Sequence, residues 1–398
     1  MRNKFIRLSG AGVAIAIAVI SNTSSRSANA AVPPQGWDSN HNPTWMMPTY
    51  EAHLNLLPME ASLPAANTPW SDTYWPSDHG GIAFRWNTPN PQGFGYRLHS
   101  LAELKAMTTN EVATLSPAEK YDIYMGRYDY PLVARERSRT SPYAADWEGI
   151  CHGWSPASLH NPEPMPNYVA NRDGIIIPFG SSDIKALLSV FYAYASFDNI
   201  GHYRFIGTRC QSLPRRGLGR IFRRPDGTCI GANPGAFHLA LGNMIGLTKQ
   251  GFVADLNRNL QVWNQPVLGY KSQMGRMHGA SRRAAPSAVS EIEVITTMFY
   301  TSEIEPTFEP VVGTEAQKIE NEEYHYTIEL NGQGEIVGGE WLNNNHPDFI
   351  WSVDKIEFNE VTGSVDFTGI KDIYRTAAQM PPAPIPNPAP APSPVPHL

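Results

Sequence analysis

The sequence predicts an α+β domain in which helices pack on one side of a mostly antiparallel sheet. Helix signals come first along the chain, and strand signals dominate after Cys229. Apolar residues make up 41% of the 398 residues, so the chain can bury a substantial core in one large domain or two. No internal repeat is present.

Two stretches in the first half carry helix signals. The first begins at Ser116 with the run Ser-Pro-Ala-Glu, which combines an N-cap, a proline at the first helical position and a capping-box glutamate. We expect this helix to run to about Gly126. The second begins at Ser181 or Ser182, and its apolar residues follow the helical spacing i, i+3, i+4 and i+7: Ile184, Leu187, Leu188 and Phe191. By contrast, residues 31 to about 90 show no sustained period and predict an irregular wrap over the core.

The second half alternates short apolar runs with turn residues, as expected of strands. Residues 237–241 and 251–255, separated by turn residues near 246–250, predict an antiparallel pair. Residues 291–300 predict a further strand. Residues 324–337, which turn at Asn331-Gly332, predict a hairpin.

The two ends of the chain differ in composition from the rest. Residues 1–30 combine basic residues, an apolar run too short to span a bilayer, and the small-x-small ending Ala-Asn-Ala, which together predict the signal peptide of an exported protein. Residues 379–398 alternate proline with small and apolar residues. They predict an extended tail that serves as a spacer or tether, with cell-surface association as one role and a merely disordered end as the alternative.

Charge limits the classes of partner. A formal charge of −6 with 17% charged residues argues against nucleic acid or an anionic membrane surface as a general partner. A basic cluster occurs between Cys210 and Cys229, two cysteines that we expect to form a local disulfide. We interpret this loop as solvated, with an anionic docking site as the alternative; its arginines are Arg215, Arg216, Arg220, Arg223 and Arg224.

The third cysteine, Cys151, is the candidate nucleophile, because pairing the other two leaves it free. It lies in the run Trp-Glu-Gly-Ile-Cys-His-Gly-Trp, residues 147–154, where two glycines permit close backbone approach and the small residues that follow could open a helix. A helix N-terminus or a neighbouring imidazolium lowers the pKa of a thiol from about 8.5 to as little as ~3.5–7.5, so we expect a reactive thiolate. The alternative is a buried, inert cysteine packed between Trp147 and Trp154.

A base and an orienting group must come from elsewhere in the chain, because His152 is adjacent to the sulfur and points in another direction. His238, within an apolar strand pattern, is the strongest candidate base. The alternative is a buried histidine whose ring nitrogens are hydrogen bonded within the core and take no part in chemistry. Asp255 ends the adjoining predicted strand, where an antiparallel pair would place it beside His238. Asn264 is the rival orienting group, since an aspartate at a strand end is often a turn residue.

Four stretches together resemble the transglutaminase elicitor family, which is known from oomycete plant pathogens and some marine bacteria. They are WEGICHGWSPAS at 147–158, GSSDIKALL at 180–188, NPGAFH at 233–238 and VWNQPVLGYK at 262–271. Shorter similarities at 116–122, 338–341 and 347–349 extend the resemblance over roughly residues 95 to 355.

The resemblance implies a papain/transglutaminase-like form of the α+β fold and a secreted protein-glutamine γ-glutamyltransferase, whose partners are proteins that carry glutamine and lysine. By position, the nucleophile would be Cys151, the base His238 and the orienting acid Asp255. The catalytic domain would span residues 145–378, after an irregular and helical region, 31–144, that is a candidate pro-segment.

Further residues are candidates for the oxyanion site and the cleft. Ala145 stands where papain-type enzymes have a glutamine, so we predict that the backbone N–H of Cys151 and the indole N–H of Trp147 replace it. An enzyme of this family would hold the acyl group as a thioester on its cysteine, and large aromatic residues could exclude water from that thioester. The candidate oxyanion and cleft residues are Trp147, Trp154, Trp263 and Asn264.

No cofactor is required by this chemistry. Glu303, Glu305 and Glu309 form the nearest acidic group that could be considered for a metal. They lack the ligand spacing and the central glycine of an EF-hand loop, so the sequence gives calcium binding no support.

Two rival functions fit the same sequence. The first is a cysteine protease or glutaminase with the same triad, in which water takes the acyl group. The second is a non-catalytic secreted adhesion or elicitor protein. Residues 262–271 bear on the second, because they resemble the short surface peptide by which plants recognise oomycete members of the family, with Leu268 and Tyr270 in place of Arg and Phe.

Overall fold

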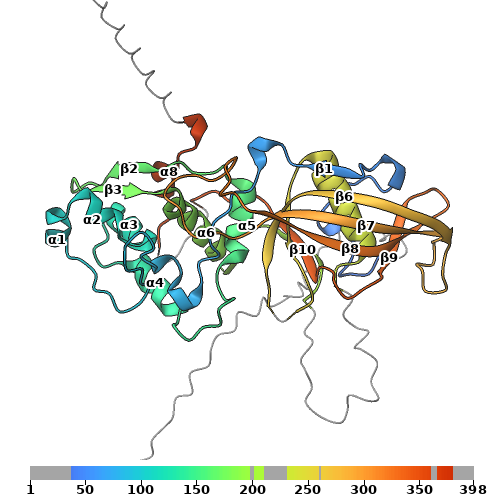
Figure 1. The fold of residues 1–398 in the computed structure, drawn as a ribbon, viewed down its shortest axis with the longest axis horizontal. Helices are drawn as coiled ribbons and strands as arrows, with labels where there is room; N and C mark the ends of the chain where they lie inside the picture. Colours follow the sequence, from blue (N-terminus) through green and yellow to red (C-terminus); the bar gives the residue numbers. More distant parts are fainter. Residues whose placement is uncertain (1–36, 198–200, 210–230, 260, 360–364, 380–398) are drawn as a thin grey trace, which may run out of the picture. The chain divides into compact units, whose positions relative to one another are not determined.

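Helices occupy the first half of the chain and strands most of the second half, so the predicted α+β class is confirmed (Figure 1). The computed structural model describes residues 37–197, 201–209, 231–259, 261–359 and 365–379. Capping boxes at Ser100, Thr108 and Ser116 begin three successive helices, the last of them as predicted. The helices are α1 (Leu101–Ala106), α2 (Thr109–Ala113), α3 (Pro117–Tyr124), α4 (Pro131–Arg139), α5 (Cys151–His160), α6 (Ser181–Phe197), α7 (Pro234–Ala240) and α8 (Ile370–Ile373).

The main sheet has eight strands, and each of its pairings is antiparallel. Its order is β4-β10-β5-β6-β7-β8-β9, with β1 paired to β6, while β2 and β3 form a separate pair. The strands are β1 (Glu60–Ser62), β2 (Asn167–Ala170), β3 (Ile176–Phe179), β4 (Tyr203–Gly207), β5 (Phe252–Asp255), β6 (Asn264–Gly279), β7 (Ser290–Thr301), β8 (Ile319–Leu330), β9 (Ile336–Trp341) and β10 (Phe349–Val353). The predicted strand at 291–300 and the hairpin at 324–337 correspond to β7 and to β8–β9.

The predicted irregular wrap is present from residue 37 to about 90, and it contributes to the core. It contains β1 and five short 3-10 helices, and its Trp70 and Trp75 are fully buried. The 3-10 helices are Pro43–Trp45, Leu54–Leu56, Ala65–Asn67, Ser77–His79 and Gly81–Ala83.

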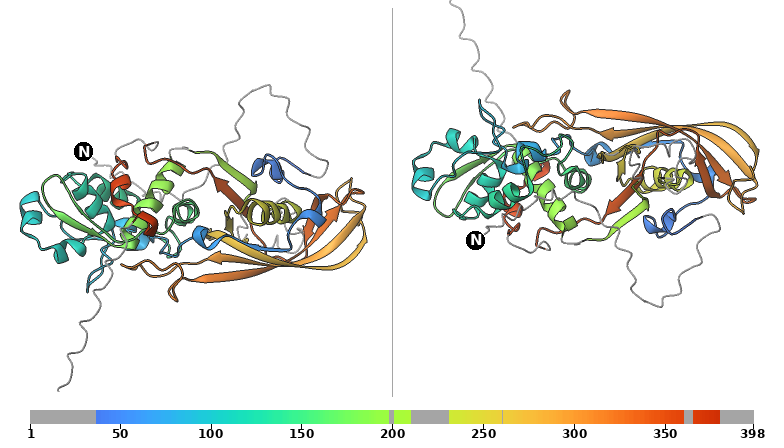
Figure 2. Two further views of the ribbon diagram at one scale, coloured as in Figure 1. Left: turned by 90° about the horizontal axis from the view of Figure 1, so that it is seen from above. Right: turned by 90° about the horizontal axis from the view of Figure 1, so that it is seen from below.

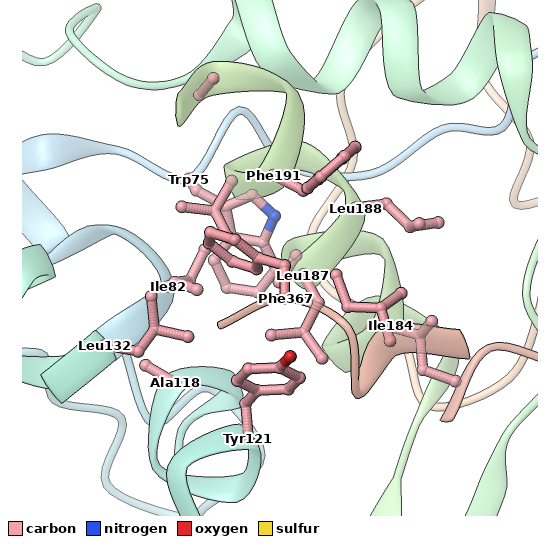
Figure 3. Packing of buried hydrophobic residues seen from close by; sticks show 14 of the residues in the cluster. Trp75, Ile82, Ala118, Tyr121, Leu132, Ile184, Leu187, Leu188, Phe191 and Phe367 are labelled. Carbon is pink, nitrogen blue, oxygen red and sulfur yellow. The ribbon is translucent and has the colours of Figure 1, made fainter. Parts of the chain in front are cut away.

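Two hydrophobic clusters form the core. The first gathers α3–α6 and includes Cys151; Figure 3 shows side chains of α6 meeting those of α3 and α4 there. The second lies between α7 and the strands from β5 to β9. In β5 and β10, Val253 and Trp351 belong to the first cluster, while Ala254 and Ile350 belong to the second. Because side chains alternate across a strand, this part of the sheet separates the two clusters.

The predicted antiparallel pair at 237–241 and 251–255 is wrong in its first member. Residues 234–240 form helix α7, which continues into a π-helical segment, Leu241–Thr248, and lies against the sheet (Figure 2). Asn233 caps α7 by accepting a hydrogen bond from Gly235 N at 2.9 Å, and Pro234 holds the first helical position. The run is buried on all sides, so its apolar pattern does not distinguish a helix from a strand.

Several predicted features lie outside the described residues. These are the signal peptide at 1–30, most of the Pro-rich tail, and the Cys210–Cys229 loop with its arginines. Among the described residues, no helix is long and apolar enough to span a membrane.

Candidate active site

Cys151 is the first residue of α5, and its thiol is free and buried. The flanking glycines allow the close packing that fixes this helix end. A Cβ on Gly149 would lie 2.5 Å from Tyr74 O, and one on Gly153 would lie 2.1 Å from Ser189 O of α6. The N-cap residue, Ile150, provides no side-chain hydrogen bond to the first turn. The start of α5 therefore lacks a side-chain cap where the sulfur lies.

The sulfur contacts Asn264, the first residue of β6, and Val262, which lies two residues before it. Asn264 Nδ2 donates to Cys151 Sγ at 3.5 Å, and the thiol donates to Val262 O at 3.6 Å. Trp351 Nε1 donates to Asn264 Oδ1 at 2.8 Å, so the amide is oriented with its NH2 group toward the sulfur. Ser155 Oγ also donates to Asn264 O at 2.5 Å, which ties α5 to β6. Asn264 is thus a fixed amide donor beside the nucleophile.

Asp255 lies directly opposite Asn264 in the β5–β6 register. Residues opposite each other on antiparallel strands face the same side of the sheet, here the side of Cys151. Asp255 Oδ1 accepts a hydrogen bond from Trp263 N at 3.1 Å, while Oδ2 has no partner among the described residues. Burial, with the charge of Asp348 as a smaller cause, raises the pKa of Asp255 well above its usual value.

The expected lowering of the Cys151 pKa is wrong. The pKa of the thiol is raised to about 11, mainly by burial and to a smaller extent by the negative charges of Glu303 and Asp255. The hydrogen bonds from Asn264 act in the opposite direction but do not outweigh the burial. The thiol is therefore protonated at neutral pH, and its attack on a substrate requires a proton acceptor.

This pKa predicts a specific alkylation profile. The rate of Cys151 alkylation by iodoacetamide should rise about tenfold per pH unit from pH 8 to pH 10, because only the thiolate reacts. In the unfolded chain, the rate of Cys151 alkylation should level off above about pH 9. Mass spectrometry of the Cys151 peptide measures both rates, with the Cys151→Ala variant as the blank. A rate that is already constant at pH 7 in the folded protein would contradict the raised pKa.

The structure does not bring His238 to Cys151. His238 lies on α7, and its Nδ1 is hydrogen bonded to Tyr326 Oη at 2.9 Å in the second cluster. Its Nε2 is buried without a partner among the described residues, and burial lowers its pKa to about 4. The predicted strand contact with Asp255 is wrong, because β5 pairs with β6 and β10. The sheet separates the second cluster, which contains Tyr326 and the neighbours of His238 on α7, from the first, which contains Cys151.

The three tryptophan candidates have different surroundings. Trp147 is half-buried, four residues before the sulfur. Trp154 is fully buried in the first cluster and thus has no surface that could line an open cleft. Trp263 is half-buried and meets the Tyr74 ring edge to face, with centroids 5.2 Å apart. Tyr74 joins the site through its backbone, because Tyr74 O accepts a hydrogen bond from Ile150 N at 2.8 Å.

The stretch that resembles the plant-recognised peptide is an inner strand in this chain. It forms the first half of β6, paired to β5, β7 and β1. Six of its residues are buried: Asn264, Gln265, Pro266, Val267, Gly269 and Tyr270. Only Lys271, at its end, is exposed.

Sequence reasoning missed the contributions of Tyr74, Glu303 and Trp351. Glu303 had been considered only with Glu305 and Glu309 as a metal site, yet it binds Gln265 instead. In the part of the chain that the structure describes, no group of three His, Cys, Asp or Glu side chains is arranged to hold a metal ion. The signal for these residues was weak, because each comes from a different segment and meets the site only in the folded chain.

Comparisons with known proteins identify the family and the fold of the chain. The family model described as transglutaminase elicitor matches residues 43–374. The crystal structure of the GP42 transglutaminase from Phytophthora sojae is similar, with a TM-score of 0.58 and 22% identity over 82% of this chain and 93% of that chain. At this identity the similarity shows a shared fold. No curated protein sequence matches significantly. Because the family model spans most of its length, the chain belongs to the transglutaminase elicitor family.

Proposed function

We propose that the protein is a secreted protein-glutamine γ-glutamyltransferase that joins glutamine and lysine side chains through a thioester on Cys151. The observation that carries this proposal is the Asn264 amide, which donates to the free thiol at the start of α5. Membership of the transglutaminase elicitor family supports the same chemistry. Secretion rests on the sequence of residues 1–30.

In the first half-reaction, Cys151 Sγ attacks the side-chain carbonyl carbon of a glutamine. Asp255 Oδ2 accepts the thiol proton and passes it to the leaving nitrogen, so that ammonia departs and the thioester remains. The raised pKa of Asp255 makes its carboxylate a stronger base than an ordinary one. Asn264 Nδ2 and the backbone N–H of Cys151 stabilise the oxyanion of the tetrahedral intermediate.

In the second half-reaction, a lysine amine attacks the thioester carbonyl carbon. Asp255 takes a proton from the attacking nitrogen and returns it to the departing sulfur. The products are the isopeptide bond and the free Cys151 thiol, so each proton that leaves the enzyme in one step is restored in the next.

The activity is tested by offering the purified protein a glutamine-bearing protein and a labelled primary amine. We expect the label to enter the protein at glutamine, with one ammonia released for each amine incorporated. Ammonia release without incorporation would contradict the transferase and favour the glutaminase. Peptide-bond cleavage would favour the protease.

A further inference from the structure

We propose that Trp351 is a positioning residue for the reaction, and that its indole N–H holds the Asn264 amide in the one orientation that presents a donor to Cys151. This inference rests on the proposed transferase function, and it names the group that keeps the oxyanion donor directed at the reacting atoms. Trp351 is 3% exposed, and the Asn264 amide bridges its indole and the sulfur. The indole therefore acts through the amide and not on the substrate.

The two orientations of an asparagine amide have nearly the same shape and opposite chemistry. With its NH2 group toward the sulfur the amide donates to the oxyanion, whereas its oxygen in that place would repel the oxyanion. In the structure, Nδ2 of Asn264 lies 3.5 Å from Cys151 Sγ, and Oδ1 lies 2.8 Å from Trp351 Nε1. A thiol donates and accepts weakly, so it selects neither orientation, but an indole N–H only donates. Trp351 therefore selects the orientation with the NH2 group at the sulfur.

The indole is itself held by the neighbouring strands. Trp351 of β10 pairs with Phe205 of β4 and Val253 of β5. Its ring stacks on Phe205, with centroids 5.7 Å and planes 22° apart, and meets the Tyr203 ring with centroids 5.9 Å apart. Because β5 lies between β10 and β6, the contact with Asn264 crosses two strand spacings, about 10 Å. The aromatic packing thus fixes where this long side chain carries its N–H.

The backbone of Asn264 is held independently of Trp351. Asn264 O accepts a hydrogen bond from Ser155 Oγ of α5 at 2.5 Å, and the residue pairs with Asp255 across the β5–β6 ladder. Loss of the indole N–H should therefore leave the residue in place and release only the amide. This separates the proposed role of Trp351 from a general role in the fold.

The test replaces Trp351 by phenylalanine, which keeps an aromatic ring and removes the N–H. Trp351→Phe should lower kcat for amine incorporation about tenfold, whereas Asn264→Ala, which removes the donor itself, should lower it about a hundredfold or more. The KM for the amine and for the glutamine substrate should stay within about twofold. Trp341→Phe is the matched control, because Trp341 Nε1 donates to Ala232 O at 2.7 Å beside the second cluster. It should leave kcat unchanged.

A double-mutant cycle distinguishes positioning from a structural role. If Trp351 acts through the amide, adding Trp351→Phe to Asn264→Ala should lower kcat by less than about twofold further. A further loss of about tenfold in that background would overturn the proposal. A folded Trp351→Phe protein with unchanged kcat would overturn it as well.

Alkylation of Cys151 by iodoacetamide tests the same link without turnover. The hydrogen bond from Asn264 lowers the pKa of the thiol, so Trp351→Phe should slow alkylation at pH 9 about threefold, and Asn264→Ala by at least as much. Trp341→Phe should react like wild type. An unchanged rate in Trp351→Phe would contradict the positioning role. If the wild type incorporates no amine, the proposed function fails, and the alkylation rates still decide the role of Trp351.

A further measurement keeps Trp351 in place, in case Trp351→Phe does not fold. In NMR spectra, Asn264→Ala should move the Trp351 indole proton resonance upfield, because its hydrogen bond is lost, and leave the Trp341 indole resonance unchanged. A Trp351 indole resonance at the same position in both proteins would show that the amide does not accept this bond, and would overturn the proposal.

Discussion

Replacing Cys151 by alanine should lower kcat for amine incorporation by at least about a thousandfold. In the proposed mechanism the thioester forms on this sulfur. Asn264 and Asp255 would remain in place, but they would have no nucleophile to activate. Steady-state incorporation of a labelled amine measures the effect.

The same substitution should leave the fold intact. Cys151 is 5% exposed, and alanine fits at a helix start without new contacts, so we expect the free energy of unfolding to fall by only about 1 kcal/mol. Circular dichroism and thermal unfolding check this. Full activity in a folded Cys151→Ala protein would place the chemistry elsewhere in the chain.

Asp255→Asn should mainly lower kcat, whereas His238→Gln should mainly lower the free energy of unfolding. Asp255→Asn should lower kcat by about a hundredfold or more, because its carboxyl group lies on the same side of the sheet as the sulfur and, in the proposed mechanism, carries the proton in both half-reactions. His238→Gln should keep kcat within about threefold. It should lower the free energy of unfolding by about 1–3 kcal/mol, because it disturbs the bond to Tyr326 inside the second cluster.

Asp354→Asn is the matched control for Asp255→Asn, since Asp354 is exposed and pairs with Arg204. It should leave kcat unchanged. His238→Gln could instead lower kcat as much as Asp255→Asn while leaving the free energy of unfolding unchanged. That result would show that His238 takes part in the reaction, and the assignment of Asp255 as proton carrier would be wrong.

Much of the fold could be predicted where local signals agree. The capping box at Ser116 and the apolar spacing after Ser181 predicted α3 and α6, because both depend on residues within one or two turns. The segment at 237–241 was predicted as a strand because a uniformly buried run carries no period. Its Asn233-Pro234 start was the signal that favoured a helix.

The candidate site could be predicted only in part. Cys151, Asp255 and Asn264 were identified from sequence, and the structure brings them to one side of the sheet. His238 was also identified, but the side of a sheet on which a residue lies depends on how distant segments pair. The thiol pKa was misjudged for the same reason, since burial and the charge of Glu303 arise from tertiary packing.

The mass of the peptide that contains Cys151, measured during turnover, tests the central claim most directly. The protein is mixed with a glutamine peptide in the absence of amine, quenched in acid and digested. We predict that the Cys151 peptide gains the mass of the substrate peptide minus ammonia, and that added hydroxylamine removes this adduct. Turnover with an unmodified Cys151 at every time point, or an adduct on another residue, would contradict the thioester account.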